Sequence, residues 1–222
     1  YLLEPIGRNT APAIALACMQ LDYDEIVLVT PSDHLIKDEK EYEKVLKKAK
    51  EFASENKLVT FGITPTFAET GFGYIETVNE FDVKAFHEKP NFEIATSYLK
   101  AGNYYWNSGM FCFKAGVFLD ELKTYSPDIY ETSKIAFENA NNTNNLIRIK
   151  HEDMANIPED SIDYAVMEKS NIVKVIPSNI SWSDVGSFDS LYEELPKDEN
   201  NNTINDNHIS IDSKNNLVYG VE

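Results

Sequence analysis

The chain has 222 residues, of which 42% are hydrophobic and 26% are charged, and its formal net charge is −17. This length suits one sizeable α/β domain, and no apolar run is long enough to suggest a membrane-spanning helix. The acidic charge argues against binding to nucleic acid polymers, which depends on many lysines and arginines, but it permits one small phosphate ligand held by a local cation or a metal. Cys18 and Cys112 lie in apolar segments and are expected to be buried, reduced thiols of a cytoplasmic protein.

Helical and strand patterns alternate along the chain. Residues 26–30 form a short β-branched run, typical of a strand buried on both faces of a parallel sheet. Thr10 and Asn91 are suited to cap helices that follow them. The predicted helices are 10–20, 38–53, 91–99, 117–125, 127–139, 161–169 and 187–195, the predicted strands are 26–30, 58–63, 74–78, 83–87, 109–113 and 172–176, and a polar loop is expected at 141–145.

This alternation predicts an α/β fold with a mixed, mostly parallel sheet flanked by helices. The tail differs, because residues 196–207 are rich in Asn and Asp and indicate an exposed linker. Short strands are predicted at 209–211 and 217–219. We therefore expect a domain over 1–195, followed over 196–222 by a linker and the start of a β-rich module.

Acidic residues follow two of the predicted strands, where ligands of such sheets usually bind. Asp33 comes directly after the strand at 26–30, and Asp184 lies between a strand and a helix. Two carboxylates at strand ends could hold one Mg²⁺ ion on a phosphate. The alternative is that each aspartate caps a turn or a helix. His34 is expected to support the site or to face solvent.

A second set of polar residues surrounds the predicted strands in the middle of the chain. Glu88 and Lys89 end the strand at 83–87, so the carboxylate could accept hydrogen bonds from sugar hydroxyls and the lysine could neutralise a phosphate. The alternative is a solvated surface pair. Asn107 offers a donor and an acceptor to a sugar, and Gly73 would let a ligand approach the backbone.

One of the two arginines, Arg8, directly precedes the helix predicted to begin at Thr10. Free backbone N–H groups at a helix start, together with a guanidinium, favour an anion or a nucleobase carbonyl. The alternative is a capped helix start with a solvated arginine.

Taken in order, these segments resemble mannose-1-phosphate guanylyltransferases, also called GDP-mannose pyrophosphorylases, of the long bacterial type. The resemblance spans residues 4 to about 195, and its specificity comes from the order of several modest motifs. The motifs are EPxGRNTAPA at 4–13, PSDH at 31–34, FGIxP at 61–65, ETGxGYI at 69–75, FxEKP at 86–90, WNSGMF at 106–111, SIDYAVMEK at 161–169 and WxDVG at 182–186.

The resemblance implies a Rossmann-like nucleotide-diphospho-sugar transferase fold and a role in polysaccharide biosynthesis. The sugar phosphate of mannose 1-phosphate would attack the α-phosphate of GTP with the help of Mg²⁺, giving GDP-mannose and pyrophosphate, chemistry that depends mostly on positioning. The implied roles are guanine and ribose contacts for Arg8, Asn9 and Thr10, metal binding for Asp33 and Asp184, mannose contacts for Gly73, Glu88 and Asn107, and phosphate contacts for Lys89 and Lys169, with Asp33, Asp184 and Lys89 as the catalytic set.

The sequence departs from the family pattern in one respect. The family begins with a strand and a GGxGxRLxP loop, followed by a Pro-Lys pair, which together grip the triphosphate, and nothing like them occurs here. We therefore expect Tyr1 to be an internal point of a longer protein, and residues 1–222 alone to bind a sugar phosphate or GDP-mannose with little or no turnover. Long members of the family also carry a C-terminal mannose-6-phosphate isomerase domain.

Two questions stay open at this point. Another hexose 1-phosphate with UTP, dTTP or CTP is the alternative substrate pair, and the segment Arg8–Thr10 favours GTP because the guanylyl members of the family carry it. The sequence does not decide between a monomer and a homo-oligomer.

Overall fold

The computed structural model describes residues 1–205 and 207–220, so residues 206, 221 and 222 of the expected C-terminal module lie outside it. The chain divides into two compact units. The first comprises Tyr1–Thr30 and Lys40–Asn179, and the second comprises Pro31–Glu39 and the described residues from Ile180 onward. Within the described ranges, no helix is long and apolar enough to cross a membrane. The expected domain boundary near residue 195 stays a prediction.

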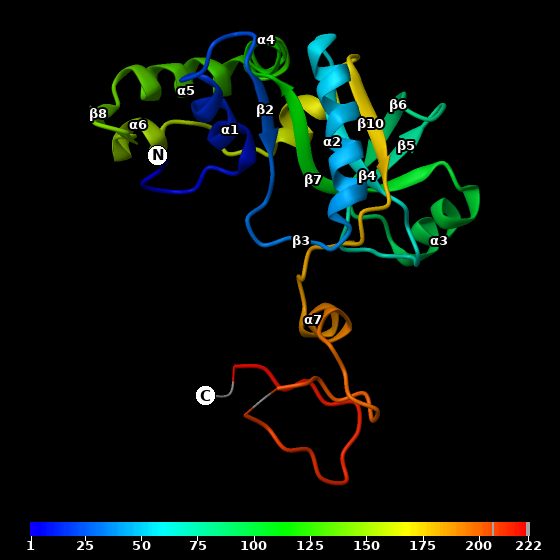
Figure 1. The fold of residues 1–222 in the computed structure, drawn as a ribbon. Helices are drawn as coiled ribbons and strands as arrows, with labels where there is room; N and C mark the ends of the chain where they lie inside the picture. Colours follow the sequence, from blue (N-terminus) through cyan, green and yellow to red (C-terminus); the bar gives the residue numbers. More distant parts are fainter. Residues whose placement is uncertain (206, 221–222) are drawn as a thin grey trace. The chain divides into compact units, whose positions relative to one another are not determined.

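A six-stranded mixed sheet lies at the centre of the first unit (Figure 1). Its longest strand, β7, pairs with three others and therefore organises the sheet. In spatial order the strands are β10 (Val173–Ser178), β4 (Leu58–Ile63), β7 (Tyr104–Lys114), β5 (Tyr74–Thr77) and β6 (Val83–His87), and β2 (Ile26–Val29) also pairs with β7.

The strand directions confirm the α/β class and the mixed sheet. They also show how far the strands run parallel to one another. Strands β2, β4, β5 and β10 share one direction, whereas β6 and β7 run the opposite way. Among the described strands of this sheet, β4 and β10 are nevertheless the one pair that is hydrogen-bonded in parallel. The reason is that β7 lies between β4 and the strands β2 and β5, so strands of the same direction are separated by one of the opposite direction.

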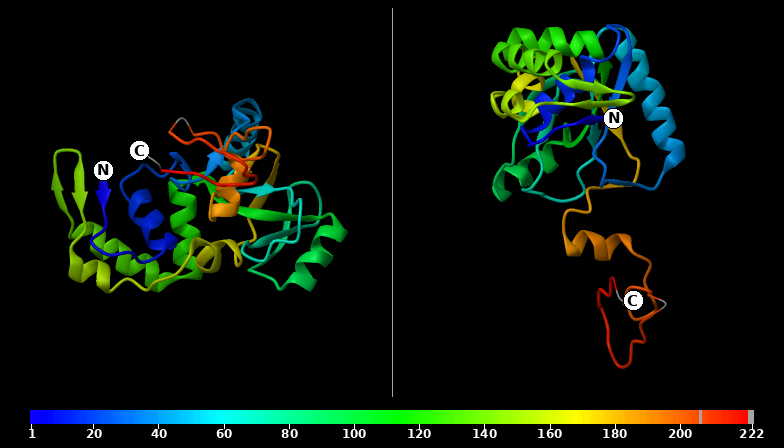
Figure 2. Two further views of the ribbon diagram at one scale, coloured as in Figure 1. Left: turned by 90° about the horizontal axis from the view of Figure 1, so that it is seen from below. Right: turned by 90° about the vertical axis from the view of Figure 1, so that its left-hand side faces the viewer.

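Helices cover both faces of this sheet, with α2 on one side and α4 and α5 on the other (Figure 2). The sequence explains the orientation of α2, because its buried residues Val45, Ala49 and Ala53 recur every four positions and charged residues separate them. The helical elements of the unit are α1 (Thr10–Cys18), α2 (Glu39–Ser54), α3 (Phe92–Ala101), α4 (Ala115–Tyr125), α5 (Pro127–Glu138), α6 (His151–Ala155) and the π-helical turn η1 (Asp163–Met167).

A small second sheet replaces the polar loop expected at 141–145. Strands β8 (Asn141–Thr143) and β9 (Leu146–Arg148) form a hairpin, and β1 (Leu2–Leu3) pairs with β9 in parallel. Asn144 takes a left-handed conformation, with a φ of 53°, which asparagine tolerates better than most residues. The polar composition therefore predicted the turn correctly but did not predict the short strands on either side of it.

The second unit contains a short antiparallel ladder and the helix α7 (Phe188–Glu194). The ladder joins β3 (Leu35–Ile36) to β11 (Trp182–Ser183). As expected, Ser187 caps α7, because its side chain accepts a hydrogen bond from the Ser190 N–H at 3.0 Å.

Side-chain hydrogen bonds organise the tail after α7, where strands were predicted. Residues 209–211 and 217–219 are described and form no strand. Asn202 is 1% exposed, donates to the Ser213 carbonyl at 3.1 Å and accepts from the Asn216 N–H at 3.2 Å. Asparagine side chains compete with the backbone for hydrogen bonds in this way.

Candidate functional site

Strands β5, β6 and β7 bring together three residues predicted to contact a sugar. Gly73 precedes β5, Glu88 follows β6 and Asn107 lies within β7, and the Asn107 N–H donates to the Gly73 carbonyl at 2.8 Å. A Cβ atom at position 73 would lie 2.7 Å from Glu88 Oε2 and 3.7 Å from Asn107 Cβ. A side chain at position 73 would therefore meet the Glu88 carboxylate, which would have to shift to make room.

The side-chain amide of Asn107 is held on both of its ends. Its Oδ1 atom accepts from the Gly109 N–H at 3.2 Å and from the Thr60 hydroxyl at 3.3 Å. Its Nδ2 atom donates to Asp163 Oδ1 at 2.8 Å. Sequence reasoning did not single out Thr60 or Asp163, although Asp163 belongs to the SIDYAVMEK motif. The structure thus adds a carboxylate to the predicted group.

Several carboxylates lie around Asn107, and some of them are partly buried. Burial is the main cause that raises the pKa of Asp163, and the nearby charge of Glu88 adds to it, whereas the hydrogen bond from Asn107 opposes the rise. Partial burial also raises the pKa of Glu168, and the charges of Asp163 and Glu88 add to that shift. Such surroundings favour neutral hydroxyl groups or a cation over an unaccompanied anion.

The two lysines predicted to bind phosphate lie at the surface. Lys89 has a left-handed conformation, with a φ of 40°, directly before Pro90, and its Nζ atom lies 3.5 Å from Glu88 Oε1. Left-handed backbone at a residue without glycine's freedom costs about 1–3 kcal/mol and often marks functional sites. The side chain of Lys89 is 64% exposed, so its charge is accessible to a ligand. Lys169 is exposed and donates to the Tyr125 carbonyl at 3.5 Å.

The segment predicted to contact the nucleotide is tied to the loop around residues 154–163. The Arg8 guanidinium donates to the carbonyls of Met154 and Ala155 at the end of α6, where a positive charge is favourable. Asn9 caps α1 through the Thr10 N–H, at 2.8 Å. These contacts give Arg8 a structural task, and its contact with a nucleotide stays a prediction.

The structure also gives Thr10 a task other than the predicted helix cap. Its hydroxyl accepts from the Ile162 N–H at 2.9 Å, and the neighbouring Ala11 N–H donates to the Asp160 carbonyl at 3.1 Å. The start of α1 is therefore fixed directly beside the turn that carries Asp163.

The two predicted metal ligands lie beyond the same end of the β3–β11 ladder. The register pairs Ser183 with Leu35, so Asp184 leaves one strand where Asp33 enters the other. One oxygen of Asp184 accepts from the Gly186 N–H at 3.2 Å, and His34 accepts from the Trp182 indole at 3.1 Å, which fits the supporting role expected of it.

This donor set fits Mg²⁺, which is commonly held by one or two carboxylates while phosphate and water complete its coordination. Among the described residues, no group of three or more His, Cys, Asp or Glu side chains is placed to hold a metal by itself. Any cation at Asp33 and Asp184 would therefore need further oxygen atoms from water or from a substrate.

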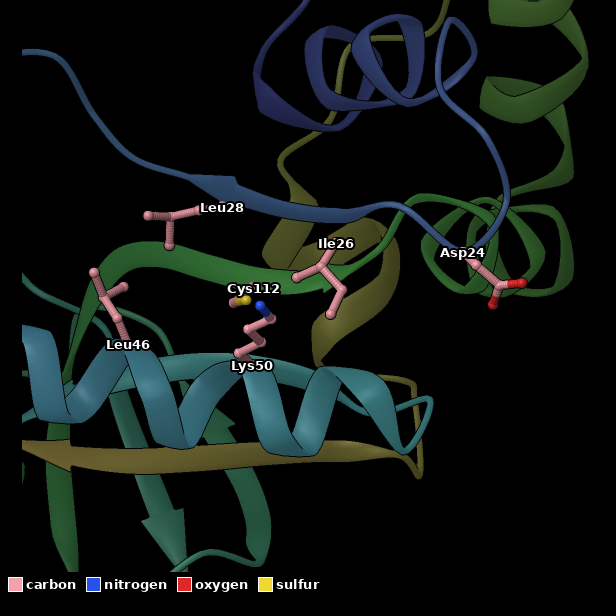
Figure 3. Close-up of a pocket in the computed structure, with 6 residues that line it drawn as sticks. All are labelled: Asp24, Ile26, Leu28, Leu46, Lys50 and Cys112. Carbon is pink, nitrogen blue, oxygen red and sulfur yellow. The ribbon is translucent and has the colours of Figure 1, made fainter.

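A pocket of about 480 Å³ in the first unit lies between β2, β7 and α2 and differs in character from the site around Asn107 (Figure 3). Ile26 and Leu28 point into it from β2, and Leu46, Lys50, Asp24 and Cys112 complete its lining. Leu28 is 41% exposed, so the prediction that residues 26–30 are buried on both faces is wrong, because this face of β2 opens into the pocket. Most of this lining is apolar, and Asp24 and Lys50 are its charged members.

Comparisons with known proteins place the chain in a family. Residues 1–201 match the nucleotidyl transferase family. The chain is 48% identical over 228 residues to a mannose-1-phosphate guanylyltransferase of Salmonella muenchen, an alignment that covers 98% of this chain and 48% of that protein. The chain thus spans about half the length of the curated relatives it matches.

Two solved structures share the fold. A Helicobacter pylori protein described as mannose-6-phosphate isomerase is 45% identical with a TM-score of 0.79, covering 82% of this chain and 74% of that one. A Thermus thermophilus protein described as mannose-1-phosphate geranyltransferase is 32% identical with a TM-score of 0.77, covering 90% of this chain and 59% of that one. From the family match over residues 1–201 and these likenesses, we conclude that the chain belongs to the nucleotidyl transferase family.

Proposed function

We propose that this chain supplies the sugar-phosphate and metal sites of an enzyme that forms GDP-mannose and pyrophosphate from GTP and mannose 1-phosphate. The observation that carries the proposal is the convergence of Gly73, Glu88 and Asn107 at the ends and centre of adjacent strands. Relatives named mannose-1-phosphate guanylyltransferase support the choice of mannose and GTP.

The chain's own residues would act by positioning the sugar and balancing its charge. Glu88 would accept hydrogen bonds from mannose hydroxyls, and the absence of a side chain at Gly73 would let the ring approach the backbone. Lys89 is exposed beside Glu88 and would neutralise the phosphate. Lys169 is proposed as a second cation for that phosphate, since it is also exposed.

Asp33 and Asp184 would hold Mg²⁺, which would lower the charge repulsion between the sugar phosphate and the nucleotide. Their placement beyond one end of the β3–β11 ladder supports this role. Arg8, Asn9 and Thr10 are proposed to shape the region that receives guanine and ribose. We place the reaction in the cytoplasm, where both phosphorylated substrates are made.

Isomerisation of mannose 6-phosphate is a second candidate activity of the full-length protein. It rests on the description of the Helicobacter pylori relative as an isomerase. We assign it to no residue of this chain. Formation of fructose 6-phosphate without any nucleotide would distinguish it from guanylyl transfer.

The proposal predicts separate effects at the sugar and metal sites. In the full-length protein, Glu88→Gln should raise the KM for mannose 1-phosphate about tenfold or more, equivalent to about 1.4 kcal/mol, and leave the KM for GTP nearly unchanged. Glu93→Gln is the matched control, because that carboxylate lies on the exposed start of α3. Equal losses for both substrates, or no loss for either, would count against the sugar site.

A second variant of the full-length protein, Asp184→Asn, tests the metal site. This variant should turn over more slowly and need a higher Mg²⁺ concentration for half-maximal rate, because one of two anionic ligands is lost. Circular dichroism and thermal melting should show an intact fold. An unchanged Mg²⁺ dependence would remove Asp184 from the metal site.

A further inference from the structure

The geometry points to Asp163 as a positioning residue that holds the Nδ2 end of the Asn107 amide, whose oxygen already accepts from Gly109 and Thr60, so that the amide serves as a hydrogen-bond donor toward a sugar hydroxyl. The inference rests on the proposed function and deepens it, because it assigns a role to Asp163, a member of the SIDYAVMEK motif for which the sequence suggested none. It concerns the kind of ligand group that fits the sugar site, namely one that both donates and accepts a hydrogen bond.

The orientation of the Asn107 amide follows from its neighbours. The backbone N–H of Gly109 can only donate, so the atom of Asn107 that lies 3.2 Å from it must be the oxygen. The Nδ2 atom therefore faces Asp163, whose oxygen is 2.8 Å away. An ionised carboxylate can only accept, so both contacts require the same orientation.

This orientation leaves Asn107 with one free function. A carbonyl oxygen has two lone pairs, and on Asn107 they are used by Gly109 and the Thr60 hydroxyl. One hydrogen on Nδ2 is committed to Asp163, which leaves the other to donate to a ligand. The sequence suggested that Asn107 would offer a donor and an acceptor, and the structure reduces this to a donor.

The neighbouring Glu88 supplies the complementary acceptor. Its Oε2 atom lies 2.7 Å from where a Cβ of Gly73 would be, and the same Cβ would lie 3.7 Å from the Asn107 Cβ atom, so the two side chains border the same space. A hydroxyl between the two side chains could therefore donate to Glu88 and accept from Asn107. The site is thus built for a group that donates and accepts at once, which a sugar hydroxyl does and an ether or a fluorine does not.

The backbone on either side of Asp163 is hydrogen-bonded to neighbouring elements. Asp163 begins the π-helical turn η1, a rare geometry that is often found at functional sites. The N–H of the preceding residue, Ile162, donates to the Thr10 hydroxyl. Ala165, two positions after Asp163, is fully buried, and its carbonyl accepts a hydrogen bond from the Ser126 hydroxyl at 2.9 Å. A carboxylate on such a support can hold Asn107 without moving when a ligand binds.

The test compares two substitutions of Asp163 in the full-length protein. Asp163→Ala removes the acceptor and should raise the KM for mannose 1-phosphate about tenfold or more, with kcat and the KM for GTP changed less than about threefold. Asp163→Asn keeps an acceptor oxygen and should restore the KM to within about threefold of wild type. Glu159→Ala, an exposed carboxylate four positions earlier, should leave every constant unchanged.

A second readout needs no substrate. The side-chain amide resonances of Asn107 in a ¹⁵N–¹H spectrum should move in Asp163→Ala and stay near wild type in Asp163→Asn. Asp163→Ser, whose hydroxyl is too short to reach Nδ2, replaces the alanine variant if that one does not fold.

The outcomes separate the inference from the proposed function. If the wild-type full-length protein makes no GDP-mannose, the proposed function fails, and the amide resonances alone decide whether Asp163 positions Asn107. If the wild type is active, but Asp163→Ala keeps both its KM and its amide resonances, the inference is overturned. The same holds if Asp163→Asn is as impaired as the alanine variant in both readouts.

Discussion

The carboxylate of Asp163 is kept in a poorly hydrated place beside another acid, Glu88. Burial and that neighbouring charge raise the pKa of Asp163 above its ordinary value of 3.8. A protein built only for stability would avoid such an arrangement, since ionised groups lose hydration on burial. The presence of Asp163 beside Asn107 therefore fits a role in ligand binding better than a role in stability.

Sequence reasoning found some of these residues and missed others for identifiable reasons. Gly73, Glu88 and Asn107 could be grouped from the sequence because they flank predicted strands and match motifs. The structure brings them together, and their contact with a sugar stays a prediction. Asp163 could not be grouped with them, because it lies inside a pattern that predicts an ordinary helix. Its hydrogen bond to a residue 56 positions away exists only in the folded chain.

The pKa shift of Asp163 leads to a prediction about stability. In the folded state this carboxyl binds its proton more tightly than in the unfolded chain, so the native state loses stability as the pH rises through and above the ordinary value of 3.8. Asp163→Asn removes that loss and should be more stable than wild type at pH 8, with the difference shrinking toward pH 3.

Urea denaturation of both proteins across this pH range measures the effect. Glu131→Gln, which changes an exposed carboxylate on α5, serves as the reference and should show no comparable trend. A wild type more stable than Asp163→Asn at pH 8 would contradict the burial cost ascribed to Asp163.

At the scale of elements, periodic patterns predicted the long helices and the buried strand β4 well. The range expected for β4, 58–63, is the observed one, and every residue of that strand is buried. The predictions were wrong where contacts with the rest of the fold, and not the local sequence pattern, determine the structure. The range 161–169 was expected to be a helix, and it contains a five-residue π-helical turn. The strand at 26–30 was expected to be covered on both faces, yet one face opens into a pocket.

The start of α1 offers a test at this scale. Arg8 donates to two carbonyls at the end of α6 from a partly buried position, and hydrogen bonds from a charged group contribute about 1.5–3 kcal/mol. Arg8→Ala should therefore lower the free energy of unfolding by about that amount without any ligand. Arg8→Lys should recover only part of it, because a lysine cannot reproduce the planar fork of the guanidinium.

Arg148→Ala is the control, since Arg148 is exposed on β9, and it should change stability by less than about 0.5 kcal/mol. Chemical denaturation gives both values. If Arg8→Ala leaves stability intact and weakens only GTP binding, the side chain serves the nucleotide directly and its contacts with α6 are incidental.

For the whole molecule, the net charge of −17 limits how phosphate can be held. An acidic chain repels phosphate esters at long range, which is why we propose local cations for phosphate binding, namely Lys89, Lys169 and a metal ion at Asp33 and Asp184. The family could be predicted from the order of short motifs and is confirmed by the match over residues 1–201. The chain spans about half the length of its curated relatives, and the substrates of the full-length protein stay a proposal.

The most direct test is to measure pyrophosphate release by the full-length protein from GTP and mannose 1-phosphate with Mg²⁺, with each substrate omitted in turn. The account predicts release that needs both substrates, stops when the metal is chelated and yields one GDP-mannose per pyrophosphate. Release with UTP and glucose 1-phosphate at an equal rate, or no release from GTP and mannose 1-phosphate, would contradict it.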